Sequence, residues 1–384
     1  MCRRIVFTQG YREETRTNKA MEKNARIIAL YLPQYHPIRE NEEWWGKGFT
    51  EWTSVGRAKS LFKGHYQPRI PADLGYYDLR IPSVREEQAS LAREAGIEGF
   101  CYWHYWFGNG KQLMAEIVDE VIETGKPDFP FMLGWANHSW YAKNWNTNDS
   151  KGKDRLLIEQ KYPGDRDLRL HYEYARHAFK DKRYIKEGNR PLFMVYSAKD
   201  IPSNMIELWN TWAKEDGFGG VYFIGNIPSK EEAKEYIESG FSAVIKNRID
   251  SSREYIYKNK IAFWYRKVLS HLLNFPDRKI DYSNAIRFLF NETEDSSEVI
   301  IPSLVPNFDH SPRSGKYGLI LHGSTPELFY RHCRQVLEVV RKKENKFVFL
   351  RSWNEWGEGN YMEPDMRYGK KYIQALRKAL YETV

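Results

Sequence analysis

The sequence predicts an α/β protein, a (β/α)8 TIM barrel with long βα loops that forms a single domain. Short apolar segments alternate with amphipathic helical patterns along the chain, which indicates parallel strands joined by right-handed crossovers. Eight such strands favour a closed barrel over an open sheet. The turn after the first strand, residues 31–37, contains no glycine, which argues against a dinucleotide-binding fold.

The expected strands are short apolar segments, and they cover residues 27–32, 99–103, 131–135, 192–196, 221–224, 243–245, 299–304 and 347–353. The expected helices repeat apolar residues at helical spacing, over 83–94, 113–124, 167–179, 204–214, 230–239 and 326–343, with a closing helix at 367–381. Thr325 and Pro326 are a typical helix start, because threonine caps the first turn and proline fits it. Long inserts are expected after strands 1, 3 and 6, at about 36–82, 136–165 and 247–298.

Residues 1–25 are mostly polar and charged, and we expect them to form a flexible N-terminal extension. Residues 26–384 show no internal repeat or linker and are expected to form the catalytic barrel. The apolar stretch near the N-terminus is too short for a signal peptide, which predicts a cytoplasmic protein. No run approaches the roughly 20 apolar residues that a transmembrane helix requires.

The formal net charge of +8 is spread along the chain rather than gathered in blocks. We therefore expect no nucleic-acid partner, whereas attraction to an anionic glycan or peripheral contact with a membrane surface is compatible with the charge. Only three cysteines occur, at wide spacing, which argues against a disulfide framework or a zinc site. No cofactor and no metal are predicted.

The aromatic content is high, with 13 Trp, 26 Tyr and 20 Phe. Many of these residues stand beside His, Asn, Asp or Glu rather than inside aliphatic runs. Flat aromatic faces pack against sugar rings while polar neighbours bond the hydroxyls, so the pattern predicts an oligo- or polysaccharide substrate.

Polar and aromatic residues gather where the expected strands end, and the active site of such a barrel lies at the carboxyl ends of its strands. The segment 44–52, which contains three tryptophans, is either a lid over the site or a plug of the barrel rim. Two of its residues, Glu51 and Trp52, are among those predicted to bind substrate. The predicted substrate-binding residues are Tyr31, Gln34, Tyr35, His36, Glu51, Trp52, Trp103, His104, Tyr105, Trp135, Asn137, His138, Trp140, Tyr196, Asp309, Trp353, Asn354 and Trp356.

Glu355 and Glu358 are the predicted catalytic residues. They stand three positions apart where the eighth strand becomes a loop, so both can face one cavity. Cleavage of a glycosidic bond needs two carboxyl groups, one as the acid and one as the base or nucleophile. Trp353 and Trp356 supply apolar surroundings that would separate the two pKa values. The alternative is that both glutamates cap a loop and pair with Arg351 or Lys370.

Two further features have alternative interpretations. His104 and His138 are either zinc ligands or hydrogen-bonding partners of sugar hydroxyls, and we favour the second, because no metal-binding histidine motif is present. Asp309 and His310 form either a polar clamp or an ordinary turn.

Five segments resemble the WbsX-like proteins, which are found among polysaccharide-biosynthesis proteins and labelled glycosyltransferases. The segments are Tyr31–Pro37, Gly48–Trp52, Tyr66–Arg69, Gly99–Trp106 and Trp353–Gly359, and the resemblance spans roughly residues 26–375. A weaker resemblance, centred on strand 8, relates the chain to the endo-α-mannosidases of glycoside hydrolase family 99, which are (β/α)8 barrels.

Endo-mannosidases carry a Glu-Trp-His-Glu run, and Glu355-Trp356-Gly357-Glu358 matches it at both carboxylates. The resemblance implies that Glu355 is the base acting on the substrate's own 2-hydroxyl, with an anhydro-sugar intermediate and retention. It implies that Glu358 is the acid/base for the leaving group and the incoming water. Gly357 replaces the histidine, which puts the substrate in doubt but not the carboxylate pair.

Three functions are therefore open. The first is a retaining, endo-α-mannosidase-like glycoside hydrolase or transglycosylase in capsular or O-antigen polysaccharide metabolism. The second is a nucleotide-sugar-dependent glycosyltransferase of lipopolysaccharide or O-antigen biosynthesis, although the sequence lacks a Gly-rich diphosphate loop and an Asp-x-Asp metal pair. The third is a non-catalytic glycan-binding barrel, and the presence of both carboxylates argues against it.

Overall fold

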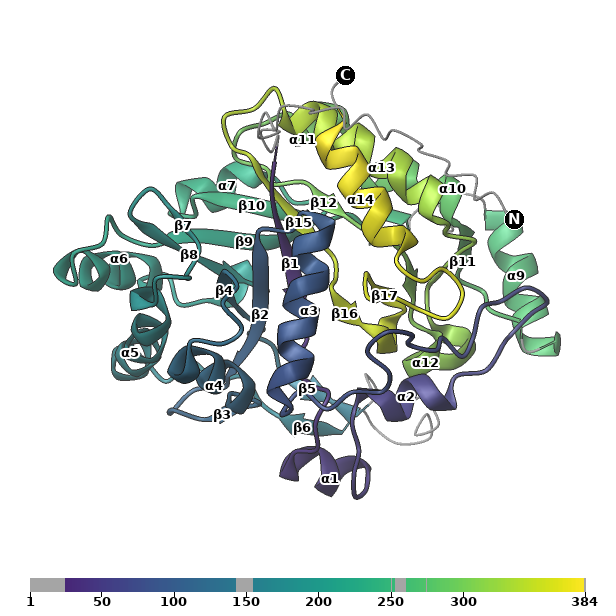
Figure 1. Ribbon diagram of the computed structural model, residues 1–384, viewed down its shortest axis with the longest axis horizontal. Coiled ribbons are helices and arrows are strands. Elements are labelled where there is room, and N and C mark those ends of the chain that lie inside the picture. Colours follow the sequence, from purple (N-terminus) through teal and green to yellow (C-terminus); the bar gives the residue numbers. More distant parts are fainter. Residues whose placement is uncertain (1–24, 143–154, 250, 253–259, 274, 383–384) are drawn as a thin grey trace, which may run out of the picture.

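Eight parallel strands form a barrel in the computed structural model, which describes residues 25–142, 155–249, 251–252, 260–273 and 275–382 (Figure 1). The strands are hydrogen-bonded in the order β10-β9-β8-β4-β2-β1-β15-β12. A parallel bridge between Val244 and Ile300 joins the two ends of this order. The predicted (β/α)8 barrel is thus confirmed. The expected N-terminal extension lies, apart from Ala25, outside the described residues.

The barrel strands are almost entirely buried, which explains their apolar and aromatic sequences. They are β1 (Arg26–Tyr31), β2 (Gly99–Trp106), β4 (Phe131–Trp135), β8 (Arg190–Val195), β9 (Tyr222–Pro228), β10 (Ala243–Asn247), β12 (Ser303–Leu304) and β15 (Phe347–Leu350).

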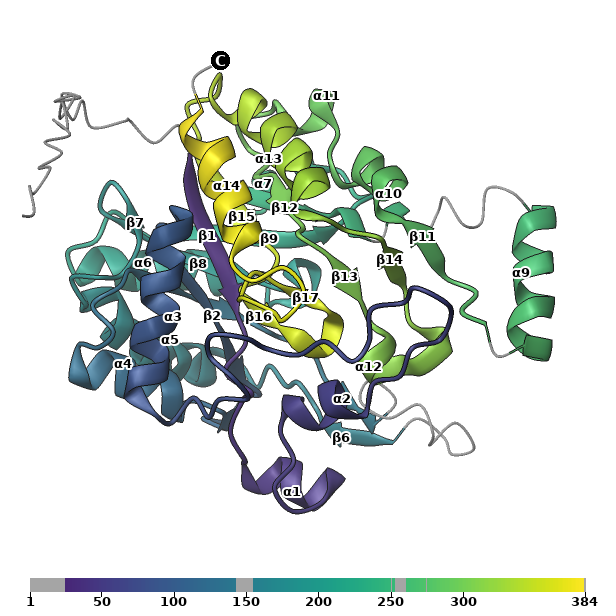
Figure 2. The ribbon, with the colours of Figure 1, turned by 45° about the vertical axis from the view of Figure 1, so that its right-hand side comes forward.

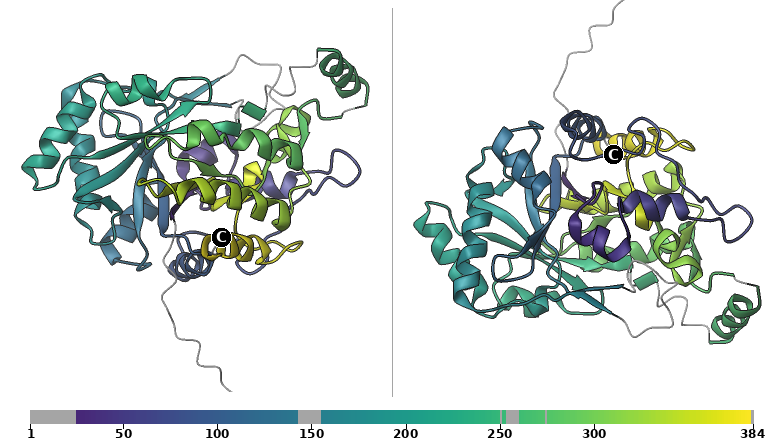
Figure 3. Two further views of the ribbon diagram at one scale, coloured as in Figure 1. Left: turned by 90° about the horizontal axis from the view of Figure 1, so that it is seen from above. Right: turned by 90° about the horizontal axis from the view of Figure 1, so that it is seen from below.

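Helices follow the strands and surround the barrel, as the view along it shows (Figure 3). They are α3 (Pro82–Ala95), α4 (Glu116–Thr124), α5 (Asp165–Lys180), α6 (Met205–Glu215), α7 (Ala233–Glu238), α10 (Tyr282–Leu289), α11 (Glu292–Asp295), α13 (Pro326–Val340) and α14 (Lys371–Tyr381). The predicted start of α13 is confirmed, because the Thr325 side chain accepts a hydrogen bond from the Leu328 backbone. Among the described residues, no helix combines the length and apolar composition needed to cross a bilayer.

Two barrel strands differ from their expected bounds. The seventh, expected at 299–304, is regular only over Ser303–Leu304, because Pro302 has no N–H to donate to a neighbouring strand. The second runs on to Trp106 instead of ending at residue 103, because Tyr105 and Trp106 pair with β3 (Gln112–Leu113). A helix was expected to begin at Leu113, the second residue of β3, and it instead starts at Glu116.

The inserts build the mouth of the barrel at the carboxyl ends of the strands (Figures 1 and 3). The first insert contributes α1 (Arg39–Trp45) and α2 (Glu51–Arg57), and the insert after β4 contributes a small sheet of β5 (Trp140–Tyr141) and β6 (Leu156–Ile158). A second small sheet contains β11 (Lys279–Asp281), β14 (Ile320–His322) and β13 (Phe308–Asp309), beside α12 (Ser311–Ser314). The sequence did not predict these elements. The remaining elements are β7 (Lys186–Glu187), α9 (Lys260–Leu273), β16 (Asn354–Glu355) and β17 (Asn360–Tyr361).

Candidate active site

A cavity of about 140 Å³ lies at the mouth of the barrel, beyond the ends of β1, β2, β4, β8 and β15. Eight of the predicted site residues line it together. They come from five strand ends and are Gln34, Trp103, Tyr105, His138, Trp140, Tyr196, Glu355 and Glu358. The structure therefore brings both candidate catalytic carboxylates to one cavity with an aromatic wall.

Glu355 is enclosed by donors and apolar rings. Its Oε1 accepts hydrogen bonds from Trp103 Nε1 and Ser352 Oγ, both at 3.1 Å. Burial and the nearby charge of Glu358 raise the pKa of this carboxyl to about 7, while Arg313 opposes the shift. Near neutral pH, Glu355 can therefore both accept and release a proton.

Glu358 has a different environment, because a buried arginine pairs with it. Arg313 Nη1 donates to Glu358 Oε1 at 2.6 Å, and His310 Nε2 lies 3.8 Å from the same oxygen. The Arg313 side chain is only 8% exposed, so solvent screens this pair weakly. The two candidate catalytic carboxyls thus meet unlike surroundings, which acid and base roles require.

Glu51 is the second carboxylate on Arg313. It stands in the first turn of α2, is fully buried, and its Oε2 lies 3.0 Å from Arg313 Nη2. Burial raises the pKa of Glu51, and Arg313 opposes that shift. The segment 44–52 is therefore neither a free lid nor a simple plug, since it inserts a charged side chain beneath the strand 8 loop.

Two glycines let this loop pass close to its neighbours. A Cβ atom at Gly357 would lie 2.1 Å from Glu51 Oε2, so no larger residue fits above the ion pair of Glu51 and Arg313. Gly359 adopts φ +53°, a left-handed conformation that suits glycine, and a Cβ there would lie 2.8 Å from Asp309 Cβ.

Four predicted substrate contacts hold the loop instead of lining the cavity. Asn354 bonds both backbone groups of Leu32, which ties the eighth strand to the first. The Tyr35 hydroxyl bonds Asn354 O and accepts from Trp356 N. The Trp52 ring packs 5.6 Å from the Trp356 ring, which stacks at 3.7 Å on Tyr361. These residues position the loop that carries Glu355 and Glu358.

The expectation of substrate contact is corrected for four more residues, which face the surrounding helices or the core. The Tyr31 hydroxyl donates to Gln88 of α3 at 2.6 Å, and the His104 and His171 Nε2 atoms lie 2.9 Å apart. Trp135 packs 4.6 Å from the His171 ring, and Trp353 packs 5.5 Å from Phe100. Side chains alternate along a strand, so when Trp103 and Tyr105 point into the cavity His104 must point away.

Three other predicted residues are buried and do not line this cavity. His36 lies 4.0 Å from Glu116 of α4, and Asn137 bonds both the Ser197 backbone nitrogen and oxygen. Asp309 accepts bonds from His65 and Gln67 inside the protein, so it is a polar clamp rather than part of an ordinary turn.

The alternatives for the ionisable residues are decided by position. His104 faces α5, whereas His138 lines the cavity with its ring 5.0 Å from Tyr196, so the two histidines do not share a metal site. Glu358 pairs with Arg313, and Lys370 pairs with Glu94. The alternative in which the strand 8 glutamates pair with Arg351 or Lys370 is therefore wrong.

The sequence did not single out Arg313, which lines the cavity and contacts both Glu51 and Glu358. It stands 45 positions before Glu358, in an insert without a recognisable pattern. Arg351 also lines the cavity, and its Nη1 donates to Asn247 Oδ1 at 3.0 Å.

Comparisons with known proteins agree with the sequence resemblance. The family described as Glycosyltransferase WbsX matches residues 27–376. Two proteins from strains of Xanthomonas campestris pv. campestris, both named uncharacterized protein WxcX, are 35% identical over 363 and 371 residues. Each alignment covers 93% of this chain and 50% of the relative, so the chain spans about half the length of the curated relatives it matches.

Solved structures share the barrel fold at low sequence identity. A glycoside hydrolase-like protein is 15% identical with a TM-score of 0.56, and the match covers 94% of this chain and 96% of the other. The GH99 endo-alpha-mannosidase from Bacteroides thetaiotaomicron is 14% identical with a TM-score of 0.53, over 93% of this chain and 96% of the other.

Proposed function

Because this chain belongs to the glycosyltransferase WbsX family, we propose that it is a carbohydrate-active enzyme that cleaves or transfers glycosidic bonds with Glu355 and Glu358. The observation that carries the proposal is the pair itself. Two glutamates from one loop line one cavity, one beside Trp103 and the other on Arg313. Hydrolysis of a glycosidic bond typically uses two carboxyl groups in different environments.

Glu355 suits the role of base. A carboxyl group with a pKa of about 7 binds a proton more strongly than an exposed glutamate, and a base works best when its pKa lies near the working pH. The bonds from Trp103 and Ser352 fix its Oε1 at the cavity wall. In the retaining mechanism implied by the endo-mannosidase resemblance, Glu355 takes the proton from a sugar hydroxyl.

The same resemblance makes Glu358 the acid and then the base at the leaving oxygen. Arg313 pairs with its carboxylate, the form that acts as base toward the incoming water. His310 Nε2 lies 3.8 Å from the same Glu358 oxygen. The aromatic wall of Trp103, Tyr105 and Trp140 supplies faces on which sugar rings pack.

A nucleotide-sugar glycosyltransferase is the second candidate, and two observations favour it. The family description names a glycosyltransferase, and two guanidinium groups, of Arg313 and Arg351, line the cavity. Arginine is well suited to binding phosphate groups. In either case we propose a substrate in capsular or O-antigen polysaccharide metabolism.

The test combines a substitution with the presence or absence of a donor. The wild type, Glu358→Gln and the surface control Glu86→Gln are incubated with α-mannosides and capsular oligosaccharides, with and without nucleotide sugars. Products without a nucleotide sugar support hydrolysis or transglycosylation, and products only with it support the second candidate. We expect Glu358→Gln to bind glycan without turnover. Full activity of this variant would exclude the two-glutamate mechanism, and binding with no turnover by any form would indicate a glycan-binding barrel.

A further inference from the structure

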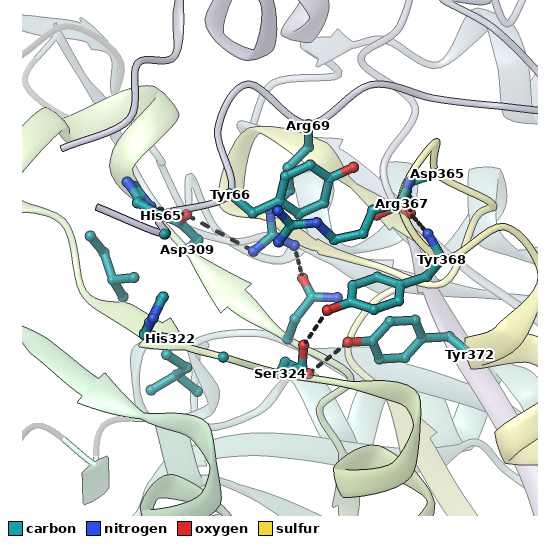
Figure 4. A pocket seen from close by; sticks show the side chains of 15 residues that line it. His65, Tyr66, Arg69, Asp309, His322, Ser324, Asp365, Arg367, Tyr368 and Tyr372 are labelled. Atoms are coloured by element: carbon teal, nitrogen blue, oxygen red, sulfur yellow. Dashed lines mark hydrogen bonds and ion pairs between the residues drawn. The ribbon is translucent and has the colours of Figure 1, made fainter. Parts of the chain in front are cut away.

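A second cavity, of about 180 Å³, lies next to the catalytic one but contains none of its carboxylates. It is framed by residues 64–69, by β14 with residues 323 and 324, and by residues 365–372 (Figure 4). It adjoins the catalytic loop closely. Arg69 Nη1 donates to the carbonyl of Gly359, the residue after Glu358, at 3.1 Å.

The two carboxylates of this cavity are saturated with internal donors. Asp309 accepts from Gln67 Nε2 at 2.8 Å and from Ser311 N at 3.0 Å. His65 donates to it as well, because His65 Nδ1 accepts from Leu61 N and so leaves the ring proton on Nε2, 2.8 Å from Asp309. Asp365 accepts from three donors, Arg367 N, Tyr368 N and the Tyr361 hydroxyl.

The two guanidinium groups of the cavity keep donors unused. Arg69 and Arg367 both lie over the Tyr66 ring, with their Cζ atoms 5.7 and 3.8 Å from its centroid. Arg69 bonds the neutral oxygens of Asn307 and Gly359, its Nε is buried without a partner, and its nearest Asp309 oxygen is 3.9 Å away. Arg69 is buried and Arg367 is exposed, and both guanidinium groups can donate to a ligand in the cavity.

We propose that this cavity binds an anionic group of a saccharide, either the carboxylate of a uronic acid or a phosphate on a sugar. Guanidinium groups bind both groups through paired N–H donors. Opposite the guanidinium groups stand the hydroxyls of Ser324 and Tyr372, which bond each other at 2.8 Å and supply polar partners for a sugar ring (Figure 4). This inference rests on the proposed function: the occupant is a sugar unit of the same polymer, away from the bond that reacts.

The test measures binding rather than turnover, in the Glu358→Gln background, so its failure leaves the cleavage experiment unaffected. The probes are a glucuronate-containing tetrasaccharide, its carboxyl-reduced counterpart, glucose 1-phosphate, glucose and inorganic phosphate, followed by calorimetry. We expect an anionic probe to bind about tenfold more tightly than its neutral counterpart, as loss of a charged hydrogen bond implies. Arg367→Gln should remove this preference, and the matched charge control Arg331→Gln should keep it.

The choice of probes distinguishes the two sources of the anion, a uronate and a sugar phosphate. A preference for the tetrasaccharide alone assigns a uronate, and a preference for glucose 1-phosphate alone assigns a sugar phosphate. The proposal is overturned if neutral and anionic saccharides bind equally, if the preference survives in Arg367→Gln, or if only inorganic phosphate binds.

A separate observation concerns α9, which lies at the edge of the molecule (Figure 2). Five large apolar side chains of this helix are exposed; they are Ile261 at 84%, Trp264 at 64%, Tyr265 at 65%, Val268 at 51% and Leu272 at 71%. Their spacing places them on one arc of about 100° at 3.6 residues per turn. The opposite side of the helix contacts the protein, since Ser270 is buried and its carbonyl accepts from Lys316 Nζ at 2.9 Å.

This orientation is the reverse of that in an ordinary surface helix, whose apolar stripe faces the core. Lys267 lies beside the exposed stripe, with its Nζ 5.5 Å from the centroid of the Trp264 ring, and the sequence of α9 contains no acidic residue. Arg266 instead turns to the protein, where its Nη1 donates to Lys279 O at 3.1 Å. Tryptophan and tyrosine favour the boundary between lipid and water, and basic residues favour anionic headgroups. We infer that α9 docks the protein on an anionic membrane surface.

Flotation with vesicles tests this second inference. We expect the full chain to float with phosphatidylcholine vesicles that contain phosphatidylglycerol, and much less with phosphatidylcholine alone. Leu272→Ser should lower the vesicle-bound fraction about tenfold, as the loss of a buried leucine implies, whereas Ile70→Ser, at an exposed position elsewhere, should not. Equal flotation of the Leu272 variant overturns the inference. So does a dimer that forms without lipid and dissociates on Leu272→Ser, which would assign the stripe to a second copy.

Discussion

Arg313 Nη1 lies 2.6 Å from Glu358 Oε1, and this contact joins an insert after strand 7 to the loop after strand 8 that carries both candidate catalytic glutamates. The same guanidinium reaches Glu51 of α2. One buried cation therefore pairs with two carboxylates from different parts of the chain, and its removal should affect stability and catalysis separately.

Arg313→Gln is expected to lower kcat about 10²–10³-fold, because it removes the charge that stabilises the Glu358 carboxylate during proton transfer. It should also lower the stability of the fold, since Glu51 would keep a buried, uncompensated charge. Combining it with Glu51→Gln should recover much of the stability, measured by urea unfolding, but not the activity. Recovery of both in the double variant would show that Arg313 acts only through the fold.

The pKa of Glu355 predicts a stability that depends on pH. This carboxyl has a pKa of about 7 in the folded chain and an ordinary value of 4.5. The unfolded chain therefore loses its proton first, and the folded state loses stability as pH rises from 4.5 to 7. The loss is at most about 3 kcal/mol above pH 7, from the size of the shift.

Glu355→Gln should consequently be more stable than the wild type at pH 8, with little difference at pH 4.5, while turnover is lost. Urea unfolding at both pH values measures the effect, and the surface variant Glu43→Gln controls for the loss of a carboxylate as such. A gain in stability that is the same at both pH values would contradict the assigned shift.

Trp103 lowers the pKa of Glu355 by donating a hydrogen bond to its Oε1 at 3.1 Å. Trp103→Phe keeps an aromatic ring in the wall but removes this donor, so the pKa of Glu355 should rise further. If Glu355 is the base, activity falls as pH drops through about 7 in the wild type, and the fall should begin at higher pH in the variant. A pH profile of kcat/KM checks this, and an unchanged profile would argue against Glu355 as the titrating base.

Gly357 tests the packing beneath the catalytic loop. Gly357→Ala places a Cβ 2.1 Å from Glu51 Oε2 and must displace either the loop or the ion pair, at about 1–3 kcal/mol. Gly56→Ala in α2 is the matched control, because a Cβ there meets no atom within 4 Å. We expect a lower denaturation midpoint and loss of activity only in the Gly357 variant. Equal midpoints for the two variants would mean that the loop yields freely.

The barrel could be predicted from the sequence because its signals are local. Each strand is a short apolar segment and each helix repeats apolar residues at its own period, so eight alternations specified the fold. The carboxylate pair was equally visible, since Glu355 and Glu358 stand three positions apart where the last strand ends. The strand ends also located the cavity, whose walls include Trp103, Trp140 and Tyr196.

The direction of each side chain was decided only by the tertiary structure. A pattern such as Trp103-His104-Tyr105 shows where a strand ends, but the alternation of side chains turned His104 toward α5, so it does not reach the cavity. Arg313 was hidden for another reason: the groups it joins, Glu51 and Glu358, stand 262 positions before and 45 positions after it. Its contacts exist only because the inserts of a closed barrel meet at one mouth, and no local pattern in the sequence encodes that meeting.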